Sequence, residues 1–213
     1  MRRAIVILFL SNLAFGCTDV LDKGSLDEVT EQTYWTSAAD LELNVNQFYP
    51  SLSGTINYFS LDEHSDNLQP LSPSGVLDGT RSVPESGGGW GWENIREINY
   101  FLENASQVTE GAQSDIDQYM GEGYFFRAYF YFQKVKRFGA VPWYDEALNI
   151  DSEELYAPRE PRNIIVDHII ADLDRAIERL QGRSQVGANR VNLESALALK
   201  SRVALYEGTW EKY

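Results

Sequence analysis

A long segment without helical periodicity, residues 54–91, gathers the side chains best suited to binding a ligand. It far exceeds the roughly four to six residues of most connections, and such long loops are usually functional or disordered. Its aromatic content is too high for ordinary disorder. Aromatic rings can stack on the C–H faces of sugars, while carboxylate, amide and guanidinium groups can bind their hydroxyls. We expect a partly ordered binding surface with these residues: Tyr58, Phe59, Asp62, Asp66, Asn67, Arg81, Trp90 and Trp92.

The single cysteine, Cys17, follows a segment typical of a secretory signal peptide. A short basic start precedes residues 4–15, which are almost wholly apolar but too short to span a bilayer. The small residues Ala14 and Gly16 come just before the cysteine. This order resembles the lipobox of bacterial lipoproteins, in which the chain is cleaved before a cysteine whose thiol carries a diacylglyceryl group. The alternatives are a secreted protein with a free thiol and a buried core cysteine.

Residues 1–16 are therefore expected to be a lipoprotein signal peptide. Residues 17–36 are expected to form the lipidated N-terminus, a tether and a lead-in segment. Each buried methylene contributes about 0.8 kcal/mol, so two or three acyl chains hold a protein stably at a membrane. No later stretch is apolar over the ~20 residues that a membrane-spanning helix needs. We expect the mature protein to be attached to a membrane through its lipid anchor.

The acidic composition restricts the possible partners. The 213 residues include 32 acidic and 18 basic side chains, a net charge of −14. Such a surface repels nucleic acid and anionic lipid headgroups. No nucleic-acid partner is expected, and the charge argues against polyanionic partners in general.

Helical periodicity outside the long segment predicts an all-α fold. Ser37 and Asp40 form a capping-box start for the first helix, and Asn192 is expected to cap the last. Residues 114–136 are aromatic on several faces, so their helix should lie centrally. On the fourth helix, Asp172, Asp174 and Glu178 are expected to be solvated. The expected helices are 38–49, 92–110, 114–136, one from near Pro161 to 180, and 193–207.

Two glycines suggest how the helices repeat. Gly139 and Gly208 are each expected to end a helix, and they lie 69 positions apart (208 − 139). This is close to two units of the ~34-residue tetratricopeptide (TPR) period. The alanine-rich stretch "ALALKSRVALYEG" also fits such helix pairs. The expected fold is all-α, with TPR-like helical pairs and long irregular loops.

No arrangement of residues indicates an enzyme. Acidic residues are so abundant that a catalytic carboxylate pair could be drawn anywhere, and no Ser or Cys lies in a nucleophile motif. His64 has no second ligand nearby, and His168 lies among isoleucines as a packing residue. "SGGGWG" lacks the lysine of a phosphate loop, and "ESGGGWGW" is interpreted as a flexible lead-in to Trp90. Asp62, Glu63 and Asp66 could bind calcium but lack the calcium-loop pattern. No metal and no cofactor are expected.

Three stretches together resemble the SusD/RagB-like nutrient-binding lipoproteins of Bacteroidota. The most specific is a helix with a central Arg-Ala-Tyr, closed by Phe-Gly-x-Val-Pro. Residues 33–52 and 92–105 fit the same pattern in the same order. Because that family is much longer than 213 residues, we expect 37–213 to be its N-terminal helical region, truncated at the C-terminus. The three stretches are "GEGYFFRAYFYFQKVKRFGAVPWY" (121–144), "PREPRNIIVDHIIADLDRAIERL" (158–180) and "NRVNLESALALKSRVALYEGTW" (189–210).

The resemblance implies a surface-exposed outer-membrane lipoprotein that is not an enzyme. It would bind a glycan or another nutrient and deliver it to a partner TonB-dependent, SusC-like transporter. The TPR-like helices would dock on that transporter. Asp19 and Asp22, soon after Cys17, resemble the surface-export signals of such lipoproteins.

The resemblance also implies candidate ligand residues, since contacts in the family often come from the long loop before the second main helix. Trp92 begins a helical stripe and could instead pack under it. Asp66 could simply hold a turn with Asn67. The positions that could match are Trp90, Trp92, Asn94, Arg81 and Asp66.

A second interpretation remains open, a membrane-tethered TPR-like adaptor that binds only protein. The two differ in the long loop. Glycan capture predicts that Trp90 and Arg81 converge on an exposed shelf. The adaptor predicts a buried or disordered loop and a bare helical groove.

Overall fold

The computed structural model describes residues 34–52, 75 and 77–213. The chain divides into two units, Met1–Trp35 and Thr36–Tyr213, and the second contains the helices α3 to α8. The expected signal peptide, the lipidation site Cys17 and the loop residue Asp66 lie outside the described residues.

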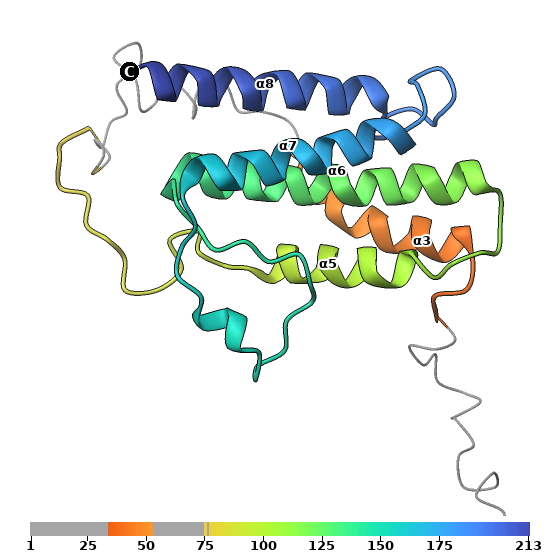
Figure 1. Ribbon diagram of the computed structural model, residues 1–213, viewed down its shortest axis with the longest axis horizontal. Helices are drawn as coiled ribbons and strands as arrows, with labels where there is room; N and C mark the ends of the chain where they lie inside the picture. Colours follow the sequence, from red (N-terminus) through yellow and green to blue (C-terminus); the bar gives the residue numbers. More distant parts are fainter. Residues whose placement is uncertain (1–33, 53–74, 76) are drawn as a thin grey trace, which may run out of the picture. The chain divides into compact units, whose positions relative to one another are not determined.

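The second unit is all-α, as predicted. In the described part of the chain there is no β-strand, only two isolated bridges. Successive helices from α5 to α8 run antiparallel, so they form helical pairs (Figure 1). The elements are α3 (Ala38–Val45), the 3-10 helix η3 (Asn46–Ser51), α5 (Glu93–Ala105), α6 (Gln113–Phe138), the 3-10 helix η4 (Glu153–Tyr156), α7 (Arg162–Arg179) and α8 (Leu193–Lys212).

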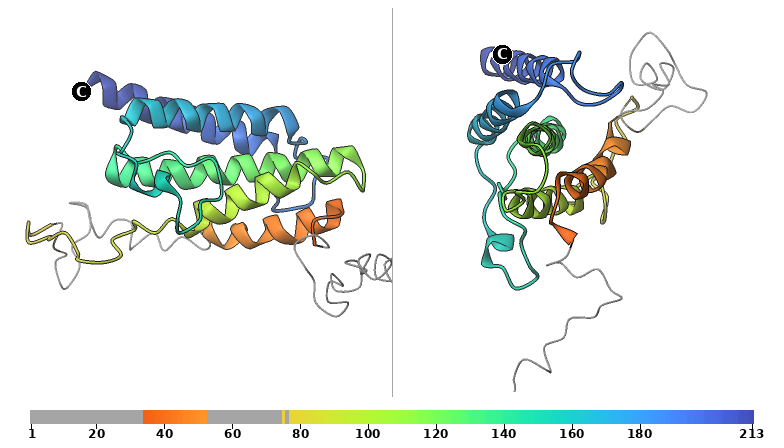
Figure 2. Two further views of the ribbon diagram at one scale, coloured as in Figure 1. Left: turned by 60° about the horizontal axis from the view of Figure 1, so that its bottom comes forward. Right: turned by 90° about the vertical axis from the view of Figure 1, so that its right-hand side faces the viewer.

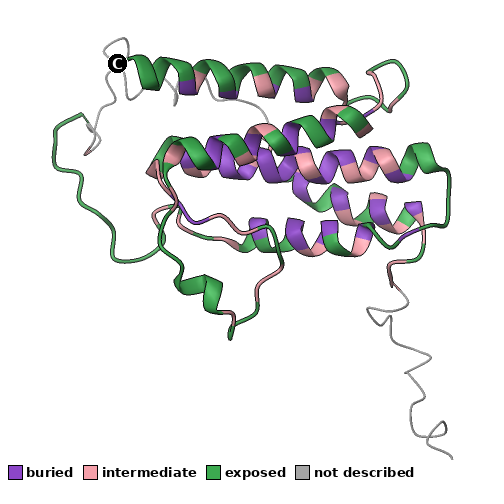
Figure 3. Cartoon of the chain, in the orientation of Figure 1, coloured by how far each residue is buried: buried purple, intermediate pink, exposed green. Residues whose placement is uncertain are grey.

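The central position predicted for the aromatic helix is confirmed. α6 contacts α3, α5, α7 and α8, and the end-on view in Figure 2 shows the other helices arranged around it. Phe126 is fully buried, with the ring centroids of Phe48, Tyr49 and Phe130 at 5.7, 5.1 and 6.1 Å. Burial of each such ring contributes roughly 1.5–3 kcal/mol. Figure 3 shows the buried residues concentrated on α6 and on the sides of its neighbours.

Two glycines let the neighbouring segments approach α6 closely. A Cβ atom on Gly123 would lie 2.7 Å from the Phe101 ring of α5. A Cβ atom on Gly121 would lie 2.9 Å from Cγ of Leu180, just after α7. No side chain fits at either position without displacing its neighbour.

The predicted helix caps are confirmed. The Asp40 carboxylate accepts hydrogen bonds from the Ser37 amide and hydroxyl, at 2.8 and 2.7 Å. The Asn192 side chain accepts from the Ser195 amide at 2.9 Å. Gly139 follows α6 with a φ of 69°, a conformation that glycine adopts readily.

Several predicted helix ends are wrong. The first helix ends as α-helix at Val45 and continues as η3 through Pro50, and α5 ends at Ala105 rather than near 110. Gly208 does not end the last helix, which runs on to Lys212. A glycine ends a helix when it turns to a left-handed conformation, whereas an interior one only costs about 1 kcal/mol relative to alanine. The 69-residue spacing therefore does not join two helix ends.

Asp172 is buried, which contradicts its predicted solvation. Its side chain is 0% exposed and forms a two-pronged ion pair with Arg127 of α6, which is 4% exposed. It shares the inward side of α7 with Ile169 and Leu173. Asp174 and Glu178 are largely exposed, as predicted. Within the described residues, no helix is both long and apolar enough to cross a membrane.

Candidate functional site

A glycine-rich turn leads from the described end of the long segment into α5. Gly87, Gly88 and Gly89 have φ values of 71, 63 and 84°, which side chains rarely tolerate. The Trp90 amide donates to the Gly87 carbonyl at 3.1 Å. A Cβ atom at Gly89 would lie 3.0 Å from Nε of Arg137. The glycines thus bring the backbone against α6, and the segment predicted to be flexible has a specific conformation.

Lys134 fastens this turn to α6. Its ammonium donates to the carbonyls of Gly89, at 2.7 Å, and Gly91. It also lies 5.0 Å from the centroid of the Trp92 ring. Partial burial lowers the pKa of Lys134, and the nearby Glu93 carboxylate opposes that shift. Lys134 therefore positions both tryptophans through the backbone between them.

The two tryptophans form a half-buried aromatic group. Their ring centroids lie 5.2 Å apart at 85°. Trp92 packs edge-on against Tyr144, at 5.2 Å, so it does contribute to packing. Trp90 packs against Phe138 at 4.8 Å, and the Arg159 guanidinium lies 4.5 Å from its centroid. Both residues keep part of their surface in solvent.

Three adjoining hollows surround this group. The aromatic cleft, of about 610 Å³, is lined by Trp90, Trp92, Tyr144 and Arg159 among others. The connecting hollow, of about 600 Å³, shares Trp90 and Arg159 with it and adds Arg81 and residues 82–84.

The third hollow, the cationic cleft, has about 740 Å³ and lies along α6. It shares Arg81 and Arg137 with the connecting hollow, and Gly91 and Ile95 with the aromatic cleft. Its lining is Ser51, Arg81, Gly89, Gly91, Asn94, Ile95, Tyr129, Phe130, Gln133, Lys134, Lys136 and Arg137.

The structure brings four of the five candidate residues to these hollows. Trp90 and Trp92 line the aromatic cleft, and the exposed Arg81 and Asn94 line the cationic cleft. Asp66 is not among the described residues.

Other residues of the hollows were not anticipated from the sequence. Phe130, Lys134 and Arg137 follow one another at helical spacing along one side of α6, together with Gln133. That spacing was the available signal. The aromatic residues on several faces of this helix predict its central position but do not indicate a cationic side.

A buried polar network supports the aromatic cleft. Arg127 donates to Asp172 through Nε and Nη2, at 2.6 and 2.7 Å, and to Asn99 at 3.1 Å. The Asn99 amide donates to the carbonyls of Tyr144 and Glu146, each at 2.9 Å. The ion pair therefore holds the loop that carries Tyr144.

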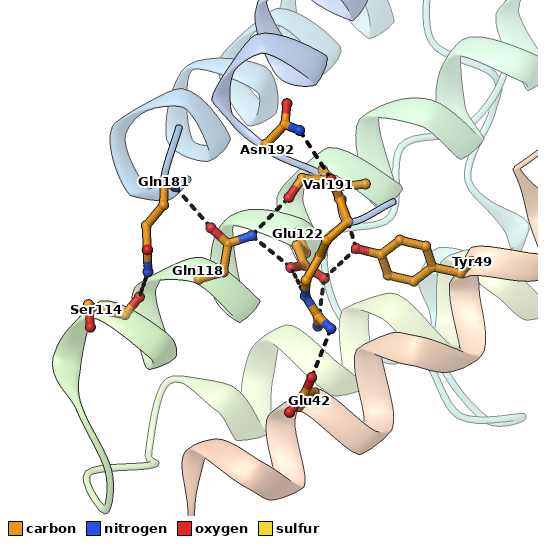
Figure 4. Close-up of polar contacts among 9 residues, drawn as sticks. Glu42, Tyr49, Ser114, Gln118, Glu122, Gln181, Val191 and Asn192 are labelled. Atoms are coloured by element: carbon orange, nitrogen blue, oxygen red, sulfur yellow. Dashed lines mark hydrogen bonds and ion pairs between the residues drawn. The ribbon is translucent and has the colours of Figure 1, made fainter. Parts of the chain in front are cut away.

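A second polar cluster, the Arg190 clasp, joins three parts of the fold (Figure 4). Arg190, in the loop before α8, donates to Glu122 of α6 at 2.6 and 3.1 Å and to Glu42 of α3 at 2.9 Å. Glu122 is fully buried and also accepts from Gln118 and from the Tyr49 hydroxyl, at 2.7 and 2.9 Å.

The polar groups of the Arg190 clasp satisfy one another. Burial raises the pKa of Glu122, while bonds from Arg190, Gln118 and Tyr49 oppose that shift. Burial also raises the pKa of Tyr49, so its phenol keeps the proton that it donates. The Tyr49 oxygen in turn accepts from the Val191 amide at 2.9 Å. The clasp therefore ties α3 and the loop before α8 to α6.

His168 and the described acidic residues form no metal-binding group. His168 stacks on Trp143, with ring centroids 4.5 Å apart. Over residues 34–52, 75 and 77–213, no three His, Cys, Asp or Glu side chains are grouped to hold a metal ion. Asp62, Glu63 and His64 are not among the described residues.

These features define an all-α protein of TPR-like helical pairs, with aromatic and cationic hollows beside its central helix. A SusD-like family model, described as "Starch-binding associating with outer membrane", matches residues 90–205, more than half of the chain. The chain belongs to this SusD-like family.

Similar proteins agree with this assignment. SusD-like protein P38 of Formosa agariphila is 23% identical over 220 residues, covering 97% of this chain and 43% of its own length. A SusD-like protein from Bacteroides fragilis has a crystal structure with a TM-score of 0.69 and 28% identity, covering 89% of this chain and 39% of its own. A laminarin-binding SusD-like protein has a TM-score of 0.66 and 22% identity, covering 82% and 41% respectively. The chain thus spans less than half the length of these relatives.

Proposed function

We propose that this protein is a surface-exposed outer-membrane lipoprotein that binds a glycan and delivers it to a TonB-dependent, SusC-like transporter. The observation that carries the proposal is the half-buried tryptophan pair, set among hollows with polar walls, in a chain of the SusD-like family. Ligand sites usually combine apolar and aromatic walls with a few polar groups.

The candidate residues take different roles in this proposal. Trp90 offers its ring for stacking on a sugar, and Trp92 supports it from the side. Arg81 and Asn94 are exposed and supply donors to sugar hydroxyls or to other oxygens. Asp66 is proposed as a further contact.

Attachment and export form the second part of the proposal. Residues 1–16 act as the signal peptide, Cys17 carries the lipid, and residues 17–36 tether the helical unit outside the cell. The protein hands its ligand on unchanged and catalyses no reaction. This part rests on the lipobox-like sequence and on the family's association with the outer membrane.

The adaptor interpretation has less support. It expects a buried or disordered loop, whereas residues 77–91 have a specific conformation and are mostly exposed. Half-buried indoles beside hollows are features of a small-ligand site. The adaptor interpretation instead expects a bare groove between helices.

Calorimetry or affinity electrophoresis against a polysaccharide panel tests the proposal. Wild-type protein should bind at least one glycan, and Trp90→Ala should bind it about two- to twelvefold more weakly, because an aromatic stacking contact contributes roughly 0.5–1.5 kcal/mol. Trp210→Ala is the matched control, since Trp210 is an exposed indole near the end of α8. Absence of binding to every glycan, or unchanged binding by Trp90→Ala, would contradict the proposed site. Hydrolysis of a bound glycan would contradict a non-catalytic role.

A further inference from the structure

The hollows beside Trp90 concentrate positive charge in an acidic protein. Five cationic side chains line the cationic cleft and the connecting hollow, and no carboxylate of the described residues lines either one. In that part of the chain, none of the five forms an ion pair. They are Arg81, Lys134, Lys136, Arg137 and Arg159.

Two of the five have a structural role. Lys134 donates to the glycine carbonyls, and the Arg159 guanidinium lies over one face of the Trp90 ring, 4.5 Å from its centroid. The other three are exposed. Partial burial and the nearby Arg202 lower the pKa of Lys136. These three side chains are therefore placed to meet an anion from solvent.

The cationic cleft also offers more hydrogen-bond donors than acceptors. Lysine and arginine are donors only, and the side chains there that can accept are neutral: Ser51, Asn94, Tyr129 and Gln133. A neutral sugar presents hydroxyls that both donate and accept, so it would leave many of these donors unmatched. Carboxylate and sulfate groups only accept, and guanidinium groups bind such planar or branched oxyanions through paired hydrogen bonds.

We propose that the cationic cleft and the connecting hollow bind an anionic oligosaccharide, one that carries carboxylate or sulfate groups. This inference rests on the proposed glycan-binding function and narrows its ligand class. The sugar ring stacks on Trp90, and its anionic substituents lie toward Arg81 and Arg137, which line the connecting hollow together with that indole. The hollows have the size of ordinary ligand sites, about 300–1,000 Å³.

The net charge of −14 argues against polyanions, but it does not describe this surface. The Debye length is about 8 Å at physiological ionic strength, so carboxylates on distant elements are largely screened. The carboxylate that acts on Lys134 is Glu93, which lines the aromatic cleft instead. A bound anion therefore meets mainly the cations of the cleft.

Matched pairs of polysaccharides that differ only in charge test this inference. We would measure affinity for homogalacturonan against its highly methyl-esterified form, and for carrageenan against chemically desulfated carrageenan. At least one charged member should bind ten or more times more tightly than its neutral counterpart. Raising NaCl from 50 to 500 mM should weaken that binding severalfold, because salt screens exposed charges.

Variants that remove charge test whether the charged polysaccharide binds in the cationic cleft. Lys136→Gln combined with Arg137→Gln should weaken binding of the charged member at least tenfold. Arg183→Gln is the control, an exposed cation in the loop between α7 and α8, at the opposite end of α6 (Figure 1). Its binding should match that of the wild type.

The outcomes separate this inference from the proposed function. Binding of the neutral member as tightly as the charged one would overturn the anionic ligand class and leave glycan capture intact. A charge preference that survives in the double variant would overturn the assignment to this cleft. Absence of binding to every member of the panel would count against both.

Discussion

The Arg127–Asp172 ion pair is the clearest case of one residue depending on a distant one. Arg127 is the arginine of the Arg-Ala-Tyr stretch, and its partner lies 45 positions further along the chain. Both side chains are almost completely removed from water. Burying two charges is costly, and removing one partner leaves the other uncompensated.

Asp172→Asn should lower the free energy of unfolding by about 3–5 kcal/mol, because it leaves the Arg127 charge buried without a counter-ion. Urea denaturation followed by circular dichroism measures the change. Asp174→Asn is the control, since this exposed aspartate on α7 pairs with Lys200 at the surface. Its loss should cost about 0–1 kcal/mol. Equal losses of stability at the two positions would show that burial of the Arg127–Asp172 pair does not add to the cost of losing the aspartate.

The Asp40 carboxylate should make stability depend on pH in the acid range. Hydrogen bonds, first that from the Ser37 hydroxyl, hold the pKa of Asp40 below its ordinary value. The ionised form is therefore favoured by folding. The ionised Asp40 contributes fully to the free energy of unfolding at pH values well above the unfolded pKa of about 3.9. This contribution is lost as the pH falls through the lower pKa of the folded state.

Asp40→Asn should be about 0.3–1 kcal/mol less stable than wild type at pH 6, because it removes a negative charge from the first turn of α3. The difference should shrink as the pH approaches 3. Denaturation curves of both proteins across this range would measure it. A difference that stays constant or grows in acid would refute the assigned sign.

Local residues could be interpreted correctly from sequence, while distant partners could not. The Ser37–Asp40 and Asn192 caps depend on residues three positions away, and both were predicted. Residue pattern alone predicts a solvated Asp172, because its burial depends on Arg127, which lies on another helix. The role of Lys134 likewise depends on the glycine turn, whose Gly89 lies 45 positions before it.

At the scale of elements, α6 sets the spacing of the bundle through its two glycines. Gly121 and Gly123 face Leu180 and Phe101, with no space for a methyl group. Helical periodicity predicted this central helix correctly. The same periodicity could not predict the hollows, which form where α6 meets the glycine turn and Arg159 from the loop before α7.

Alanine substitutions at two helical glycines should change the stability of the protein in opposite directions. Gly208→Ala should stabilise the protein by about 0.5–1 kcal/mol, because Gly208 lies inside α8 with open space around it. Gly123→Ala gains the same helix propensity but pushes a methyl group into Phe101, which should cost about 1–3 kcal/mol. Thermal unfolding of both variants measures whether each substitution raises or lowers stability. Stabilisation by Gly123→Ala would mean that α5 can move away freely.

At the scale of the whole molecule, the net charge of the chain differs in sign from the charge of the two hollows. The acidic excess is spread over the chain, whereas five cations line the cationic cleft and the connecting hollow. The sequence indicated the overall charge and the all-α class. It could not indicate the positive charge of the hollows, because the five cations come from three separate segments of the chain.

Cys17→Ser should release the protein from membranes in cells that process lipoproteins, since the proposed anchor needs the thiol. Detergent phase partitioning should move the protein from the detergent phase to the aqueous phase. Mass spectrometry of the wild type should show an acylated N-terminal cysteine. An unmodified cysteine in membrane-bound protein would contradict this mode of attachment.

The Arg190 clasp has a mechanical consequence if the chain is anchored at Cys17. Tension on the anchor reaches the helical unit first at α3. Through Glu42, Arg190 and Glu122, that load passes directly to the central helix, which is held by all its neighbours. These bonds should therefore keep α3 attached to α6 when the anchor is pulled.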